Sequence, residues 1–284
     1  MRRAHTCIYA PPNLRSPPFS LPENCSPERA ALAEPLSVVL HAIRRASLQP
    51  GQSVLVLGVG SIGILACSLA RTLGASRVAA ADINRARLDW ALAHGVADDI
   101  FQVPTAPRSN DSVSIKSRSS PADEGIRRSK ENATEALRSF GLLDGFDIVI
   151  ECTGVESSAQ MGIFVRVIVD LLLLQLLTWL VFQCVGTGGK LMLVGMGTAT
   201  MCLPISAAAT REVDILGTFR YANTYPSALA MLASGHLRGV DPLITHRIPL
   251  DRAGDAFKLL RNGTDDNGNL VLKVVVEPPS SVSF

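Results

Sequence analysis

A glycine-rich turn constrains the fold of this chain more than any other feature of its sequence. Gly58, Gly60 and Gly63 are spaced as G-x-G-x-x-G, directly after a short Val/Leu run and directly before a helical pattern over 61–73. Asp82 stands 19 residues after the last of these glycines, at the end of a second apolar run. A strand, this turn, a helix and a later acidic residue are together typical of a dinucleotide-binding βαβ unit.

Each glycine of the turn has a predicted role in holding a pyrophosphate. Gly58 permits the tight turn, Gly60 lets the backbone approach the phosphates, and Gly63 lets the following helix pack closely on the strand. The amides at the start of the helix and the positive end of its dipole then face the phosphate charge. The sequence therefore predicts a nucleotide bound beyond the end of the first strand.

The acidic residue after the second strand bears on which dinucleotide is bound. Asp82 would accept hydrogen bonds from an adenosine ribose and repel a 2′-phosphate, so it favours NAD over NADP. Arg85 and Arg87 follow closely and weaken that preference, because either side chain could cover the adenine or meet a phosphate. The alternative is a purely structural turn in which Asp82 caps the next helix.

The alternation of apolar runs and helical patterns predicts the fold class. Apolar runs alternate with helical patterns over 61–73 and 84–94, and the runs lie at 53–57, 77–81, 146–151, 190–194 and 213–221. This order predicts an α/β fold, a doubly wound parallel (Rossmann) sheet with helices on both faces and remnants of a second, catalytic domain. With 47% hydrophobic residues, 18% charged residues and a net charge of +2, the composition excludes a disordered chain and a basic nucleic-acid-binding arm.

The chain is expected to contain four segments. They are a proline-rich leader at 1–26, a connecting helix and turn at 27–50, an NAD-binding domain at 51–240 and a C-terminal segment at 241–284. Within the domain, residues 104–132 contain seven serines among charged residues, which predicts a solvated loop between the third strand and its helix.

Residues 165–185 account for much of the mean hydropathy of +0.26. This stretch approaches the ~20 residues that cross a bilayer. Asp170 and two glutamines make a span marginal, and insertion would place consecutive strands of one sheet on opposite sides of a membrane. We therefore expect residues 165–183 to be an insertion into the domain, such as translated intron sequence. A membrane tether is the weaker alternative.

The cysteines indicate neither a metal cluster nor a disulfide scaffold. None of the six forms a Cys-x-x-Cys pair, and the first ten residues lack the apolar run of a secretory signal. These features favour a reducing compartment and a cytoplasmic protein.

Several stretches of the chain resemble the medium-chain zinc alcohol dehydrogenases. The resemblance rests on the glycine turn together with residues 27–38, 147–154 and 188–195. Glu34 within Glu-Pro-Leu-Ser-Val, with residues 218–221 and 245–247, is similar to the polyol branch, which contains sorbitol, xylitol and L-arabinitol dehydrogenases. This similarity runs from about Leu21 to Val276, with a poor fit at 104–140 and in the apolar insertion.

The resemblance implies hydride transfer between a secondary alcohol, here a small polyol, and NAD, with a zinc ion polarising the alcohol oxygen. Glu34 matches the glutamate that the polyol branch places at the zinc or its water. Members of the family commonly pair subunits through the edge of this sheet, so a homo-oligomer is one possible state, and the sequence leaves the oligomeric state open. The implied cofactor contacts are Ser61 and Ile62 with the pyrophosphate, Asp82 with the ribose, Arg87 on the adenosine side, Val194 at the nicotinamide end, and Thr218, Phe219 and Arg220 across the cleft.

One departure from the family bears on activity. Its members carry an N-terminal catalytic domain with the remaining zinc ligands, and that domain is largely missing from this sequence. Catalytic zinc needs about three protein ligands, so Glu34 alone cannot hold the ion. No catalytic residue is assigned, and the alternative function is a catalytically inactive NAD-binding fragment.

Overall fold

The computed structural model describes residues 7–8, 19–105, 120–142, 144–165 and 188–278 of the chain. Its centre is a six-stranded parallel sheet with the strand order β5-β4-β3-β6-β7-β8. The strands are β3 (Ser53–Leu57), β4 (Arg77–Asp82), β5 (Asp99–Gln102), β6 (Ile148–Glu151), β7 (Gly189–Leu193) and β8 (Val213–Gly217). The strand order reverses between β3 and β6, which confirms the doubly wound parallel sheet and creates a switch point for ligand binding.

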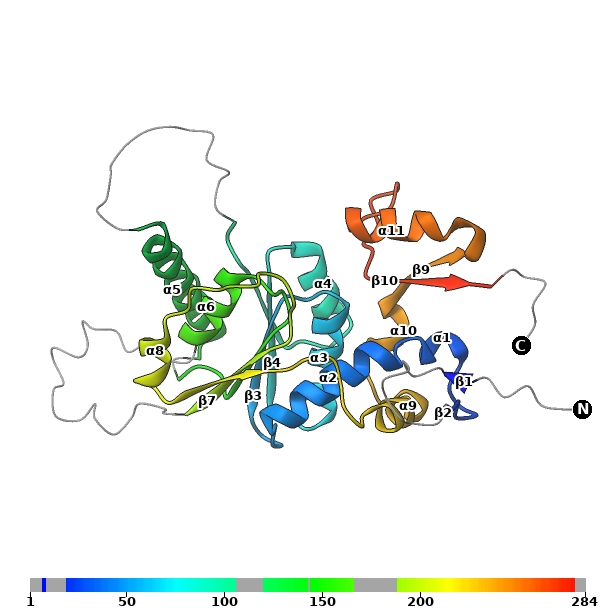
Figure 1. Ribbon diagram of the computed structural model, residues 1–284, viewed down its shortest axis with the longest axis horizontal. Helices are drawn as coiled ribbons and strands as arrows, with labels where there is room; N and C mark the ends of the chain where they lie inside the picture. Colours follow the sequence, from blue (N-terminus) through cyan, green and yellow to red (C-terminus); the bar gives the residue numbers. More distant parts are fainter. Residues whose placement is uncertain (1–6, 9–18, 106–119, 143, 166–187, 279–284) are drawn as a thin grey trace, which may run out of the picture.

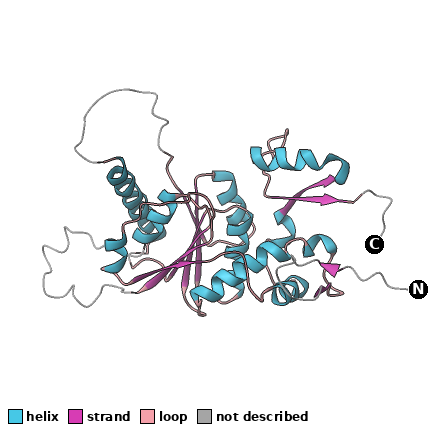
Figure 2. Cartoon of the chain, in the orientation of Figure 1, coloured by secondary structure: helices cyan, strands magenta, loops and turns pink. Residues whose placement is uncertain are grey.

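Helices cover both faces of this sheet (Figures 1 and 2). Val54 and Val56 of β3 belong to one core cluster, and Leu55 and Leu57 belong to the other. Because successive side chains of a strand point to opposite faces, a strand buried on both faces must be apolar throughout. One layer contains α2 (Ala33–Ala46), α3 (Ser61–Thr72), α4 (Arg85–Ala93) and α9 (Tyr225–Ser234), and the other contains α5 (Pro121–Phe140), α6 (Glu156–Phe164) and α8 (Ile205–Ala209).

The expected connecting helix after Pro27 is divided into two helices. The short α1 (Pro27–Ala30) begins where the Ser26 hydroxyl accepts the Arg29 N–H at 3.1 Å, and α2 follows from Ala33. The second helix ends at Ser47, which has a left-handed φ of 55°. Its apolar side packs against α3 and α9.

The prediction of a loop over 104–132 is wrong from Pro121 onward. Helix α5 begins there with a capping box, in which the Ser120 hydroxyl and the Asp123 carboxylate bond each other's backbone amides. The helix continues to Phe140 because its buried positions recur at helical spacing in its second half. Residues 106–119 of the predicted loop lie outside the described residues.

The C-terminal segment forms a small unit on the far side of the helix layer that contains α3 and α4 (Figure 1). Its longest helix is followed by a turn at Gly268, which has a left-handed φ of 81°, and then by an apolar strand. The Ser61 hydroxyl at the start of α3 donates to the Leu272 carbonyl at 2.6 Å, which ties this unit to the glycine turn. The unit contains α10 (Val240–Leu243), β9 (Ile244–Pro249), the 3-10 turn η2 (Leu250–Arg252), α11 (Ala253–Asn262) and β10 (Lys273–Glu277), with β9 and β10 parallel. Near the other end of the chain, β1 (Cys7–Ile8) and β2 (Phe19–Ser20) form an antiparallel pair.

Candidate dinucleotide-binding site

The glycine turn joins β3 to α3 in a conformation that only small residues allow. Gly58 has φ +88°, and its N–H donates to the Ala81 carbonyl at 2.7 Å. A Cβ at Gly58 would lie 2.5 Å from the Thr153 methyl group, and one at Gly63 would clash with the carbonyl oxygen of Gly58. Both glycines are therefore required for close packing of the turn.

Gly60 differs from the other two glycines because no atoms pack against the position where a side chain would begin. A Cβ there would meet no atom within 4 Å. Gly60 is the N-cap of α3, and no side chain caps this helix. The first amides of α3 thus have no side-chain cap, and the space beside Gly60 leaves room for a phosphate at the positive end of the helix dipole.

Asp82 ends β4 beside this turn and is buried. One carboxylate oxygen accepts the Val59 N–H at 2.7 Å, and the other accepts the Asn84 N–H at 2.8 Å. The N-cap of α4 is Asn84 and not Asp82, because the Asn84 side chain accepts the Arg87 N–H at 3.3 Å. Asp82 therefore stabilises the turn through these hydrogen bonds. The same side chain is the predicted partner of the ribose.

Arg87 is a second charged group at this point. Its guanidinium Nη1 lies 3.9 Å from the nearer Asp82 oxygen. Its Nε is buried and has no hydrogen-bond partner among the described residues. A buried donor without a partner is costly, so the position suits a ligand that brings an acceptor.

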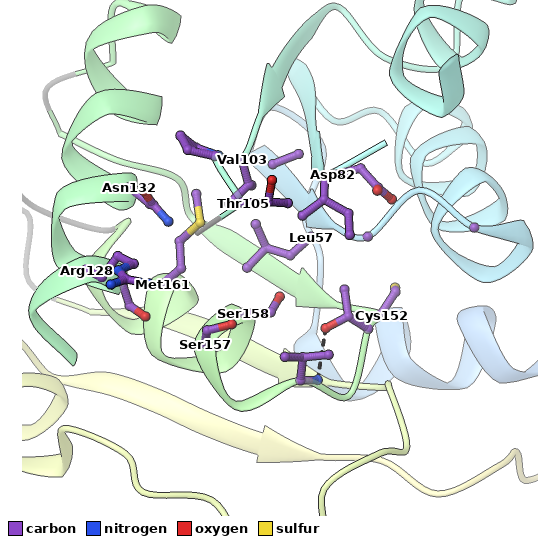
Figure 3. A pocket seen from close by; sticks show the side chains of 18 of the residues that line it. Leu57, Asp82, Val103, Thr105, Arg128, Asn132, Cys152, Ser157, Ser158 and Met161 are labelled. Atoms are coloured by element: carbon purple, nitrogen blue, oxygen red, sulfur yellow. Dashed lines mark hydrogen bonds between the residues drawn. The ribbon is translucent and has the colours of Figure 1, made fainter. Parts of the chain in front are cut away.

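A cavity of about 670 Å³ opens in front of these residues (Figure 3). Gly58, Gly60, Asp82 and Arg87 line it, so the structure brings together four of the predicted contacts. The opposite walls come from α5, from α6 and from the turn after β6. This cavity lies at the carboxyl ends of the strands, where doubly wound sheets bind nucleotides.

The turn after β6 is held by a buried carboxylate. Glu151 accepts the Thr153 N–H at 2.7 Å and the Gly154 N–H at 3.0 Å. Cys152, which stands between Glu151 and Thr153 in the sequence, also lines the cavity. Burial, with the neighbouring Glu151 carboxylate, raises the pKa of the Cys152 thiol well above its ordinary value. The thiol therefore stays protonated at neutral pH and is a poor nucleophile.

Ser61, Ile62 and Gly63 do not line the cavity. The Ser61 hydroxyl is taken by the Leu272 carbonyl, and Ile62 is partly buried against the first core cluster. Gly63 packs against the backbone of Gly58. These three residues position the turn, and only their backbone amides remain available to a phosphate.

The predicted contacts on the nicotinamide side lie after β7 and β8, away from the lining of this cavity. The Val194 N–H donates to the Glu151 carbonyl at 2.8 Å, and the Thr218 N–H donates to the Leu193 carbonyl at 3.1 Å. The Thr218 hydroxyl oxygen is buried without a partner among the described residues.

Phe219 and Arg220 follow directly after Thr218. Phe219 is 69% exposed, and the Arg220 guanidinium lies 5.5 Å from the centre of its ring. Arg220 has a left-handed φ of 52°, a backbone conformation that residues other than glycine rarely adopt. The two side chains thus contact each other beside the end of β8.

Helices α5 and α6 contribute lining residues that were not predicted. They are Gly125, Arg128, Ser129, Asn132, Ser157, Ser158 and Met161. The α5 residues were missed because their stretch was interpreted as a loop. The Ser-x-x-Asp capping signal at 120–123 would have revealed the helix.

The described residues do not fit a catalytic zinc ion. Glu34 is exposed near the start of α2. In the part of the chain that the structure describes, no three His, Cys, Asp or Glu side chains gather where they could hold a metal. Glu34 therefore has no partner ligands there.

Comparison with known proteins shows the family of this chain. The family of zinc-binding dehydrogenases matches residues 61–234. The chain belongs to this family. It is 39% identical to sorbitol dehydrogenase of Bos taurus over 91% of the chain and 59% of that protein. It is 37% identical to sorbitol dehydrogenase of Homo sapiens over 86% of the chain and 56% of that protein. The chain thus spans less than two thirds of the length of these relatives.

Solved structures share the fold. L-idonate 5-dehydrogenase of Escherichia coli superposes with a TM-score of 0.62 at 24% identity, covering 91% of this chain and 59% of the other. 2R,3R-butanediol dehydrogenase of Bacillus subtilis gives a TM-score of 0.64 at 22% identity, covering 92% and 60%. Both likenesses support the Rossmann-type architecture.

None of the helices within the described ranges is long and apolar enough to cross a membrane. Of the apolar stretch 165–185, which contains the predicted insertion at 165–183, all but Val165 lies outside those ranges.

Two substitutions in the glycine turn form a matched pair. Gly63→Ala would drive a methyl group into the Gly58 carbonyl, so we expect it to lower the free energy of unfolding by about 1–3 kcal/mol. The added methyl group of Gly60→Ala would lie in open space, so this substitution should change the free energy of unfolding by less than about 0.5 kcal/mol. Urea unfolding followed by circular dichroism measures both. Equal losses would contradict the packing described for this turn.

Proposed function

We propose that this chain binds NAD and forms the cofactor-binding half of a polyol dehydrogenase. The reaction is hydride transfer between a secondary alcohol, of the kind that the relatives' name sorbitol dehydrogenase indicates, and the nicotinamide of NAD. The observation that carries the proposal is the buried Asp82 carboxylate beside the open Gly60 turn, inside one cavity.

The adenosine side of the cofactor would be held by groups that the chain already presents. The pyrophosphate would accept hydrogen bonds from the first amides of α3, where Gly60 leaves the approach open. The adenosine ribose would donate to Asp82, and the Nε of Arg87, which has no partner among the described residues, would donate to the nucleotide.

The nicotinamide side is proposed from the family resemblance. Val194, Thr218, Phe219 and Arg220 would contact the cofactor beyond the ends of β7 and β8. The Thr218 hydroxyl supports this assignment, because it is buried and finds no partner in the described part of the chain, so that a ligand could satisfy it. Zinc supplies Lewis-acid polarisation of the alcohol in the family, and the residues described here do not hold it. No step is assigned to Glu34.

A second candidate function follows from that disagreement: NAD binding without turnover. The absence of three potential zinc ligands in one place among the described residues favours it. Cytoplasmic location and pairing of subunits stay predictions of the sequence.

Cofactor preference tests the proposal at Asp82. NADH should bind, and NADPH should bind at least about tenfold more weakly, because its 2′-phosphate would lie against a buried carboxylate. Asp82→Asn removes the charge and keeps one of the two acceptor oxygens, enough for the Val59 N–H but not also for the Asn84 N–H. It should therefore reduce the ratio between the NADPH and NADH dissociation constants, with thermal unfolding as the check that the variant is folded. Quenching or enhancement of NADH and NADPH fluorescence measures the dissociation constants. No binding of either dinucleotide at millimolar concentration would refute the proposal.

Turnover separates the two candidate functions. With NAD, zinc and sorbitol or xylitol, we expect this chain alone to form no NADH, because the described residues lack a zinc site. Absorbance at the NADH band measures the product, with bovine sorbitol dehydrogenase as the positive control. Zinc-dependent NADH formation would show that this chain completes its own catalytic site.

A further inference from the structure

Helix α5 forms the cavity wall that faces Asp82. Gly125, Arg128, Ser129 and Asn132 line the cavity, and their spacing of three and four residues places them on one side of the helix. Figure 3 shows Arg128 and Asn132 on α5, with Asp82 on the far side of the hollow. The cavity therefore continues past the ribose position to a polar wall that the glycine turn does not supply.

The surface between Asp82 and α5 is apolar. Leu57, Ala81, Val103 and Met161 line this part of the cavity. Such a surface suits the flat face of a heterocyclic base, whose polar edge would then need partners at the rim. With the ribose held at Asp82, the base of an adenosine would lie over these side chains and direct its edge toward α5.

The polar side chains of the α5 wall differ in how many hydrogen-bonding groups remain available to a ligand. The Ser129 hydroxyl donates to the buried Gln160 side chain at 2.9 Å. The Arg128 guanidinium lies 3.7 Å from the Glu124 carboxylate and is half exposed. The half-buried Asn132 carboxamide takes part in none of the hydrogen bonds found between described residues. Asn132 thus brings both a donor and an acceptor to this wall.

We propose that Asn132 recognises the adenine base of the bound dinucleotide. Its carboxamide oxygen would accept the 6-amino group while its NH₂ donates to N7, the two-bond pairing that a carboxamide makes with adenine. This inference rests on the proposed function and adds a specificity-determining residue to it. Asn132 selects the base and takes no part in hydride transfer.

Base analogues test this assignment in the full chain. Reduced nicotinamide hypoxanthine dinucleotide replaces the 6-amino donor with a carbonyl oxygen, so the Asn132 oxygen loses its partner. The chain should bind NADH roughly tenfold more tightly than this analogue. Asn132→Ala and Asn132→Leu should weaken NADH binding by a similar factor and remove the preference. Glu135→Ala, an exposed position on the same helix outside the cavity lining, is the control and should leave both affinities unchanged.

The outcomes separate this inference from the proposed function. Fluorescence titration gives the affinities, and thermal unfolding shows that each variant remains folded. If NADH binds and the Asn132 variants keep the wild-type preference for adenine, Asn132 is not the base-recognising residue and the proposed function stands. If the unaltered chain binds neither dinucleotide, both proposals fail.

Discussion

The candidate site depends on a buried hydrogen bond between the Val59 N–H and the Asp82 carboxylate, at 2.7 Å. It joins the turn after β3 to the end of β4, and the Gly58 N–H reinforces it by donating to the Ala81 carbonyl at 2.7 Å. A buried carboxylate is tolerated only when donors surround it, and the Val59 and Asn84 amides provide them. The same carboxylate lines the cavity, so one side chain both holds the turn and supplies the ribose acceptor of the proposed function.

The central part of the fold was predictable because short-range patterns determine it. Strands buried on both faces must be apolar throughout, and the G-x-G-x-x-G spacing allows few alternatives to a strand–turn–helix unit. Helix α5 was missed because its first half carries charged and polar side chains, with few apolar positions to show the helical period. As a result, Asn132 and Arg128 were absent from the predicted site although they line the cavity.

Other features depend on contacts between distant segments, which spacing alone does not reveal. The family resemblance implies that Ser61 contacts the pyrophosphate, and in the structure the Ser61 hydroxyl donates to the Leu272 carbonyl, 211 residues away. This bond uses a side chain of the phosphate turn to attach the C-terminal unit. The role of this hydroxyl could not be predicted from the sequence, because it depends on a contact that forms only in the folded chain.

The cavity between the glycine turn and α5 is the proposed adenosine site. A crystal structure of the protein soaked with ADP-ribose tests it most directly. We expect the pyrophosphate at the first amides of α3, the adenosine ribose hydroxyls within hydrogen-bonding distance of Asp82, and the base against α5. An ADP-ribose bound elsewhere, with this cavity empty at a saturating concentration, would contradict the account.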